Sequence, residues 1–180
     1  MKTRRQVFAE SAERNRIADA TPEFCTANRL VTDQNGKTGR AFSLGKYPAR
    51  HNACEAIALH NAKVLTGRES KLSDAIEAVV RGRAVPLKGF FGTLPWKLGR
   101  VLANEGVPFE KVRFRECVSD GVYILSFWNK KPWKNGLHTV AATRSGGTFT
   151  LYNWSGTTAL NDEAFRKMKR RFVCGHKIVS

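Results

Sequence analysis

The sequence predicts an α+β fold in which a helical first half precedes an antiparallel sheet. Residues 53 to 104 show the apolar spacings and caps typical of helices. Residues 109 to 153 instead contain short runs that are rich in β-branched and aromatic residues. Helices followed by strands in this order are typical of α+β proteins. At 180 residues the chain is long enough for one proper core, so we expect a single domain over 1–180.

Two elements are predicted ahead of the central helices. A short amphipathic helix over residues 1–20 should end at Thr21-Pro22, because proline does not continue a helix. The segment Asp33-Gln34-Asn35-Gly36 is a turn signal, and it predicts a hairpin between residues 29–31 and 38–42.

Three further helices follow from caps, spacing and breakers. One runs from about Ala53 to Leu65 and carries Cys54 on or beside its buried face. The next is expected over 73–81 with Ser73 as its N-cap. The third begins after Thr93, with Pro95 in its first turn, and ends before Gly106.

Strands are predicted over 109–114, 121–128, 137–143 and 148–153. The last two should form a tight hairpin through Ser145-Gly146-Gly147, since glycine readily adopts the positive φ of such turns. Asn161 should then cap a basic helix that runs to about Arg171. A final apolar piece over 177–179 is predicted to add an edge strand.

Charge is the unusual feature of the composition. The chain has 31 Lys and Arg against 15 Asp and Glu, a net charge of +16. Such a field favours acidic partners, whether a nucleic acid, an anionic membrane or an acidic protein. A basic surface with no partner is the alternative, because the basic residues are spread along the chain. The local concentration that would serve a partner consists of Arg166, Lys167, Lys169, Arg170 and Arg171.

The cysteines and the N-terminus exclude several classes of protein. The four cysteines contain no CxxC pair, which argues against a zinc site or a redox dithiol, and no motif calls for a cofactor. The N-terminal residues are basic without an apolar stretch behind them, and no apolar run reaches membrane-spanning length. We therefore expect a cytoplasmic protein without metal or cofactor, with leaderless export left open.

Cys54, His138 and Asn153 are the candidate catalytic residues. Cys54 begins a predicted helix, where the helix dipole and a neighbouring imidazolium stabilise a thiolate. His138 opens a predicted strand and would take and return the proton, while Asn153, at the end of the next strand, would orient it. The alternative is an inert buried thiol beside an ordinary strand histidine.

These residues resemble the papain-like cysteine peptidase superfamily, in particular small bacterial forms such as the peptidase domains of bacteriocin-exporting transporters. The resemblance is carried by residues 52–58, 136–140 and 151–153, within a core over 43–155. It leaves an N-terminal extension over 1–42 and a C-terminal part over 156–180. It implies a Cys-bearing helix packed on an antiparallel sheet that holds the His, and a peptide or protein substrate.

Two departures from the family pattern concern the oxyanion site. The family has a Gln six positions before the Cys and a Gly directly after it, whereas this chain has Pro48 and Glu55 there. Pro48 has no donor, so we expect Asn52 to supply one, with the Cys54 backbone N–H or a group such as Gln34 as alternatives. Asn52 acting as a plain helix cap is equally reasonable. Trp128 and Trp133, in the basic loop before His138, are candidates for the substrate cleft.

Three functional hypotheses follow from the sequence. The first is a cysteine hydrolase that cleaves or transfers at a peptide or amide bond through Cys54, His138 and Asn153. The second is a catalytically weak or inactive papain-like module that binds a nucleic acid or an acidic protein. The third is a structural partner protein without chemistry.

Overall fold

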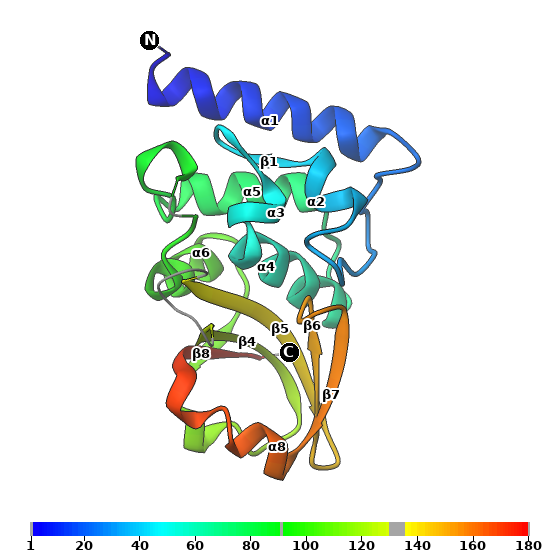
Figure 1. Ribbon diagram of the computed structural model, residues 1–180, viewed down its shortest axis with the longest axis vertical. Helices are drawn as coiled ribbons and strands as arrows, with labels where there is room; N and C mark the ends of the chain where they lie inside the picture. The colour runs from blue at the N-terminus through cyan, green and yellow to red at the C-terminus, as the bar shows by residue number, and fades with distance from the viewer. Residues whose placement is uncertain (1, 91, 130–135, 180) are drawn as a thin grey trace.

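The protein is mixed α+β, with a layer of helices packed on one face of a sheet (Figure 1). The computed structural model describes residues 2–90, 92–129 and 136–179. Within these residues the α-helices are α1 (Arg4–Ala20), α2 (Lys37–Ala41), α3 (Ala49–Asn52), α4 (Cys54–Leu65), α5 (Leu72–Arg81), α6 (Leu98–Asn104) and α8 (Asp162–Arg166). The strands are β1 (Ser43–Leu44), β2 (Tyr47–Pro48), β3 (Phe109–Val112), β4 (Gly121–Trp128), β5 (Leu137–Ser145), β6 (Thr148–Tyr152), β7 (Thr157–Asn161) and β8 (Phe172–Ile178).

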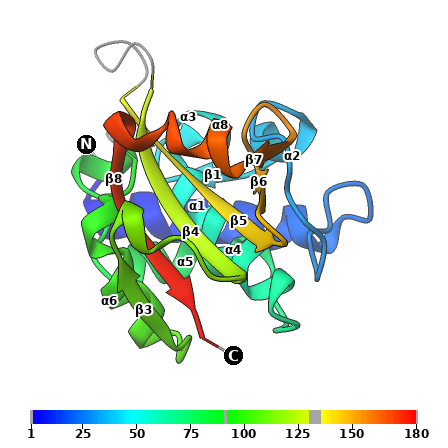
Figure 2. The ribbon, with the colours of Figure 1, turned by 90° about the horizontal axis from the view of Figure 1, so that it is seen from below.

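The main sheet has six strands in the order β3-β8-β4-β5-β6-β7, and every neighbouring pair is antiparallel (Figure 2). The prediction of an edge strand over 177–179 was wrong, because β8 lies between β3 and β4. Its backbone pairs with both neighbours. The short apolar run had suggested an edge position, but pairing with two strands places β8 inside the sheet. The edge strands are β3 and β7, and β7 was not predicted from the sequence.

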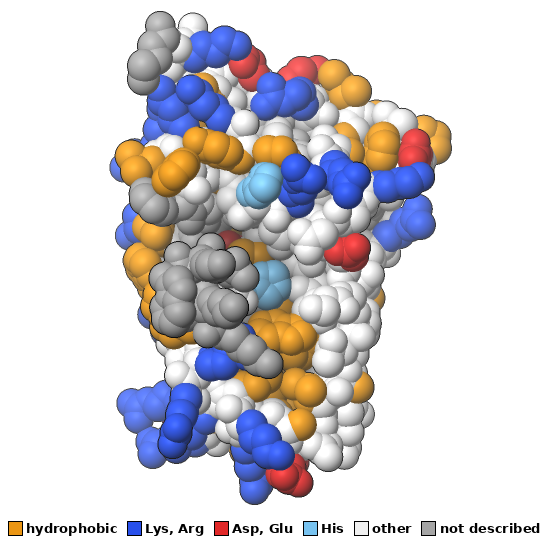
Figure 3. All heavy atoms as spheres, in the orientation of Figure 1, with side chains coloured by type: hydrophobic (Ala, Val, Ile, Leu, Met, Phe, Trp, Pro, Cys, Tyr) orange, Lys and Arg blue, Asp and Glu red, His pale blue; other side chains and the backbone are white. Residues whose placement is uncertain are grey.

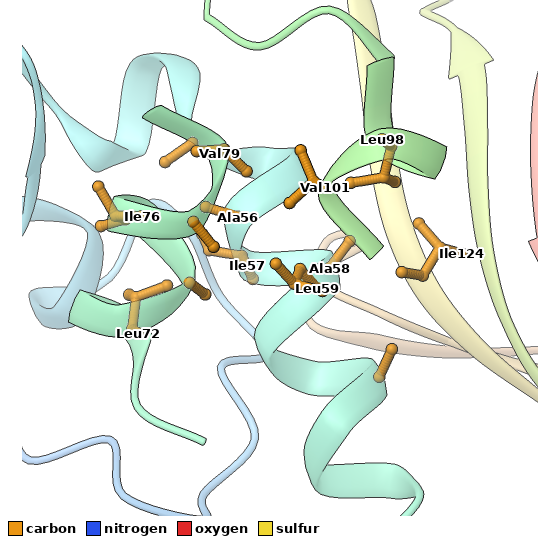
Figure 4. Close-up of a cluster of buried hydrophobic side chains, with 14 of the residues drawn as sticks. Ala56, Ile57, Ala58, Leu59, Leu72, Ile76, Val79, Leu98, Val101 and Ile124 are labelled. Atoms are coloured by element: carbon orange, nitrogen blue, oxygen red, sulfur yellow. The ribbon is translucent and has the colours of Figure 1, made fainter. Parts of the chain in front are cut away.

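Helix α4 is the centre of the larger core. Its apolar side chains lie between those of α5, α6 and Ile124 of β4 (Figure 4). The small residues Ala56 and Ala58 are fully buried beside Ile57 and Leu59, which lets neighbouring backbones approach the helix closely. This packing holds the first residue of α4, Cys54, at a fixed place above the sheet.

A second, aromatic core lies on the other face of the sheet under α8. Phe149 of β6 stacks on Phe165 of α8 with ring centroids 3.8 Å apart. Tyr123 and Phe127 of β4 are fully buried beside them. Burial of side chains of this size contributes about 1.5–3 kcal/mol each, so this core fixes β4 to β6 and the residues at their ends.

The segment before β1 folds differently from the predicted hairpin. The turn at Asp33 is present, because Gly36 N–H donates to the Asp33 carbonyl, but residues 37–41 are helical. Val31 has no partner strand: its N–H donates to Asn61 Oδ1 at 2.8 Å, and its carbonyl accepts from Asn61 Nδ2 at 2.8 Å. The Asn61 side chain therefore supplies both hydrogen bonds that a second strand would have supplied.

Helix α1 confirms the predicted N-terminal helix. Its Thr3 and Gln6 form a reciprocal capping box. Ser11 and Asn15 on its inner face hydrogen-bond the carbonyl of Ser43, which attaches the helix to the β1–β2 hairpin.

Two helix starts were predicted at the wrong residue. Ser73 lies inside α5 rather than capping it, and its N–H donates to the buried carboxylate of Asp19 instead. The helix expected after Thr93 begins as a 3₁₀ turn over Pro95–Lys97, and α6 starts only at Leu98. The contact between Ser73 and Asp19 accounts for the shifted start of α5, and the ring of Pro95 accounts for that of α6.

The hairpin and the C-terminal cap are confirmed. Ser145 pairs with Thr148, and both intervening glycines have positive φ, 53° for Gly146 and 80° for Gly147. Asn161 caps α8 by accepting from Ala164 N–H. The helix ends at Arg166, however, and a separate 3₁₀ turn over Lys169–Arg171 leads into β8.

Candidate active site

Cys54 is the first residue of α4 and is 8% exposed. The short helix α3 ends two residues earlier, at Asn52, and Ala53 joins the two helices. Because α4 packs against β5, the Cys54 thiol lies between a helix N-terminus and the strand that carries His138. A helix N-terminus favours negative charge on a group placed there.

The immediate surroundings of the thiol oppose its ionisation. Burial raises the pKa of Cys54 well above the ordinary value, and the neighbouring charge of Glu55 raises it further. The backbone N–H groups of Thr139 and Glu55 approach the sulfur and act in the opposite direction. The thiol donates to Glu55 Oε2 at 3.2 Å. In the free protein Cys54 is therefore a neutral thiol held next to β5.

Glu55 belongs to a buried polar chain that the sequence did not reveal. It is 2% exposed, and its Oε1 accepts from Thr139 Oγ1 at 3.1 Å. Thr139 Oγ1 in turn lies 2.8 Å from Ser126 Oγ on β4. Burial raises the pKa of Glu55 to about 7. Glu55 is in the first turn of α4, as expected, but it faces the sheet rather than solvent.

His138 is the second residue of β5, and its ring is fixed by a backbone carbonyl. Its Nε2 lies 2.6 Å from the carbonyl oxygen of Asn153. A carbonyl only accepts, so Nε2 carries the hydrogen and Nδ1 of the neutral ring is the basic nitrogen. Burial lowers the pKa of His138, and the bond to Asn153 partly offsets this effect. A neutral imidazole with one defined basic nitrogen is suited to accept a proton.

Asn153 holds His138 through its backbone and not through its side chain. The residue follows β6 and has a φ of 68°, in the left-handed region. Its side-chain Oδ1 accepts from Gln34 N–H at 2.8 Å, and its Nδ2 donates to Gln34 Oε1 at 3.0 Å. The side chain therefore ties the end of β6 to the loop before α2, and this tie orients the carbonyl that His138 binds.

Gln34 connects both sides of the site. Its Nε2 donates to the carbonyls of Ala49 and Arg50 in α3, while its backbone and Oε1 hold Asn153. The sequence identified the segment around Gln34 as a turn and named Gln34 as one alternative oxyanion donor. No local pattern could show its pairing with a residue so far along the chain.

These residues surround one cavity of about 880 Å³. Figure 3 shows histidine, apolar and several basic side chains exposed together on one face of the molecule. The described residues that line the cavity come from α3, α4, β5, the loop before α2, the ends of β4 and β6 and the turn before β8. They are Asp33, Gln34, Asn35, Arg50, His51, Cys54, Asn129, Leu137, His138, Asn153, Trp154, Ser155 and Arg171.

Asn52 is placed away from the cavity. Its Nδ2 donates to the carbonyls of Leu44 and Gly89, so both amide hydrogens are engaged on the far side of α3. It does not cap α4 either, because the N-cap position is Ala53 and no side chain bonds there. Its Oδ1 is buried without a hydrogen-bond partner. In this structure neither of the roles expected for Asn52 applies.

Among the described residues, the tryptophan that lines the cavity is Trp154, directly after Asn153. Its ring centroid lies 5.6 Å from that of His138. Trp128 is 44% exposed and is not among the lining residues, and Trp133 lies outside the described residues. The sequence analysis did not single out Trp154 among the four tryptophans; its adjacency to Asn153 was the signal that could have indicated it.

Comparison of the chain with protein-family models and with curated proteins gives no match. No helix in the described part of the chain is long and apolar enough to cross a membrane. The described residues also contain no group of three or more His, Cys, Asp or Glu side chains able to hold a metal ion.

Proposed function

We propose that the protein is a cysteine hydrolase or acyl transferase that acts on a peptide or amide bond. The observation that carries this proposal is that Cys54, His138 and Asn153 line the same cavity, with His138 Nε2–H bound to Asn153. A Cys-bearing helix packed on an antiparallel sheet that carries the His also supports the resemblance to the papain-like superfamily.

The proposed reaction begins from a neutral thiol and a neutral imidazole. As Cys54 Sγ attacks the substrate carbonyl carbon, His138 Nδ1 accepts the thiol proton. The tetrahedral intermediate collapses when the amine leaves with that proton, and a thioester remains on Cys54. Water or a second amine then attacks the thioester while His138 again takes a proton. Its return to Cys54 restores the thiol and releases the acid or the new amide.

The oxyanion would be held by backbone groups rather than by Asn52. The Cys54 N–H lies at the N-terminus of α4, where helix amides point outward and favour negative charge. Gln34 lines the cavity, but its Nε2 already donates to two carbonyls. We therefore infer one backbone donor, Cys54 N–H, and expect an enzyme that is slow because each missing donor costs about 10²–10³ in rate.

The experiment is the reaction of the four thiols with a chloroacetyl peptide amide, followed by intact-protein mass and peptide mapping. Cys54 should react faster than Cys25, Cys117 and Cys174, although it is more buried than Cys25. His138→Ala should slow the reaction of Cys54 by about 10²–10⁴. His51→Ala is the matched control, since His51 lines the same cavity but is exposed and away from β5. Equal reactivity of Cys54 and Cys25, unchanged by His138→Ala, would refute the proposal.

A second candidate is a binding module for an acidic partner. It is favoured by the raised pKa of Cys54 and by Arg166, Lys167, Lys169 and Arg170, which are exposed beside α8. This candidate predicts an affinity for nucleic acid that falls steeply with salt, by about 10³–10⁵ between 50 and 200 mM if six to ten phosphates are contacted. Replacing these four residues by Gln should abolish retention on a nucleic-acid column while leaving the reactivity of Cys54 unchanged.

A further inference from the structure

Arg171 is a cavity residue whose guanidinium is fixed in place by two contacts. Its Nε donates to the carbonyl oxygen of Trp128 at 2.7 Å. Its Cζ lies 5.3 Å from the centroid of the Trp154 ring. These contacts use the Nε–H and one face of the planar group, which leaves the two terminal nitrogens for a ligand. A guanidinium oriented in this way matches the geometry of a carboxylate.

The guanidinium is linked to the candidate catalytic residues through Trp154. The Trp154 ring contacts the His138 ring on one side, at 5.6 Å, and the Arg171 guanidinium at 5.3 Å. The Trp154 ring is therefore the single side chain between the Arg171 guanidinium and the His138 imidazole along these contacts. Two or three extended residues, at about 3.3–3.6 Å each, span these two contacts, so a substrate held by Arg171 can extend to the His138 ring.

Basic side chains outnumber acidic ones among the described residues that line the cavity. Arg50 and Arg171 both line it, and within the described ranges neither has a carboxylate at ion-pair distance. Asp33, the one carboxylate among the described lining residues, accepts from the backbone N–H of Asn35.

Arg144 is an arginine with a structural role, and it serves as a comparison for Arg171. Its guanidinium pairs with Asp120 at 3.0 Å and with Asp162 at 3.1 Å, and it stacks on Phe149. Arg171 has the same aromatic contact but lacks the carboxylates. The Nε of Arg171 is bonded to Trp128, whereas that of Arg144 is buried without a partner. The terminal nitrogens of Arg144 are thus used in ion pairs, while those of Arg171 face no carboxylate among the described residues and are available to a ligand.

We propose that the cavity selects substrates that carry a carboxylate two or three residues from the bond attacked by Cys54, and that Arg171 binds this carboxylate. The proposal rests on the function proposed above for the same cavity. The carboxylate has two possible sources, the C-terminus of a peptide or an acidic side chain. Arg171 is then a specificity residue and Trp154 its support.

The test compares pairs of chloroacetyl peptides that differ only in charge. One pair is chloroacetyl-Gly-Gly with a free carboxylate against its amide, and the other is chloroacetyl-Gly-Asp-amide against chloroacetyl-Gly-Asn-amide. In each reaction Cys54 Sγ bonds to the methylene carbon, chloride leaves, and the thiol proton passes to His138. At least one charged probe should alkylate Cys54 about tenfold faster than its neutral partner. The pair that shows the preference identifies the source of the carboxylate.

Variants separate local recognition from the general attraction of a basic protein. Arg171→Gln should bring the charged-to-neutral ratio close to one, and Arg171→Lys should leave an intermediate ratio. Arg5→Gln removes the same charge from the exposed surface of α1 and should leave the ratio unchanged. Circular dichroism and the melting temperature show that each variant is folded. A ratio near one in the wild type, or a ratio that Arg171→Gln does not change, overturns the proposal.

A binding measurement distinguishes failure of this proposal from failure of the proposed function. The Cys54→Ala variant is titrated with acetyl-Gly-Gly, acetyl-Gly-Asp-amide and their neutral analogues by calorimetry. If a charged peptide binds about tenfold tighter and Arg171→Gln removes the difference, the carboxylate site stands even when Cys54 shows no special reactivity. If Cys54 reacts selectively but neither charged peptide is preferred, the hydrolase proposal survives and the carboxylate site is refuted.

Discussion

The two walls of the cavity have opposite electrostatic character. The helix wall, at the start of α4, presents the Cys54 thiol against the buried carboxyl of Glu55. The sheet wall, from β5 to the turn before β8, presents His138, Trp154 and the guanidinium of Arg171. Burial and the carboxyl of Glu55 disfavour negative charge on the thiol, whereas the guanidinium of Arg171 favours negative charge on a ligand. The proposed nucleophile and the groups proposed to activate it therefore come from different halves of the fold.

This difference explains why the helix N-terminus does not by itself produce a thiolate. The dipole at the start of α4 favours the ion, but burial and the charge of Glu55 both raise the pKa of Cys54. Burial dominates, so the thiol remains protonated until a partner across the cavity accepts its proton. The site would thus work by proton transfer during attack rather than through a preformed ion pair.

Removal of the Asn153 side chain should have the largest effect on stability and tests the support of the sheet wall. Asn153→Ala breaks both side-chain bonds to Gln34 and leaves buried polar groups unpaired. It also places alanine, which lacks the polar side chain that helps asparagine adopt this conformation, at a φ of 68°. We expect a loss of about 4 kcal/mol in urea unfolding at pH 7. Asn28→Ala, at an exposed position with a φ of 53° and a single side-chain bond, from Ser70 N–H, should cost about half as much. Equal losses would mean that backbone strain alone holds this wall.

The charge of the helix wall is tested by Glu55→Gln. The pKa of Glu55 is raised from 4.5 to about 7, so the folded state resists ionisation of this group. Below pH 4.5 the carboxyl is neutral in both states and costs nothing, whereas above pH 7 the full cost is present. The variant should gain stability over the wild type between about pH 5 and 7, to a limit of about 3 kcal/mol.

Urea unfolding at several pH values measures this difference and cancels the contribution of the buried histidines, which both proteins share. Glu110→Gln is the control, since Glu110 is exposed and should show no such gain. A difference between Glu55→Gln and wild type that does not change with pH would show that the two walls do not differ in charge as described.

The smallest expected effect concerns Trp154, which supports Arg171 in the sheet wall. Trp154→Leu removes the ring that lies between His138 and Arg171. A cation–π contact of this kind contributes about 0.5–1 kcal/mol, so the charged-to-neutral ratio of Cys54 alkylation should fall about threefold. Trp96→Leu, at an exposed position outside the cavity, should leave the ratio unchanged. No change with Trp154→Leu would mean that the bond to Trp128 alone positions Arg171.

Much of the fold followed from local patterns. Helix α4 and strands β4 to β6 were predicted close to their observed bounds, because apolar periodicity and the Gly146-Gly147 turn act over a few residues. The errors lie where distant residues decide the outcome. Asn61 replaces a strand beside Val31, and pairing with two neighbours places β8 inside the sheet.

In the candidate site, too, local patterns predicted some features, and contacts between distant residues decided the others. The order of Cys54, His138 and Asn153 could be predicted from the sequence, as could their positions at the ends of elements. The partner of His138 is a backbone carbonyl, which every residue possesses, so no side-chain pattern indicates it. The buried setting of Glu55 and the tie between Gln34 and Asn153 depend on packing between segments far apart in the chain. Asn52 was a reasonable donor by position, yet the carbonyls of Leu44 and Gly89 engage its amide.

The interior position of β8 has a consequence for biosynthesis. Strands β3 and β4 are made well before residues 172–178, yet they do not pair with each other and must wait for β8 to fill the space between them. Arg171 arrives with that strand, after Cys54, His138 and Asn153 have left the ribosome. Pairing between segments so distant in sequence is slow to form. Cys54, His138 and Asn153 are therefore made before Arg171, so the proposed carboxylate contact can form only after β8 has entered the sheet.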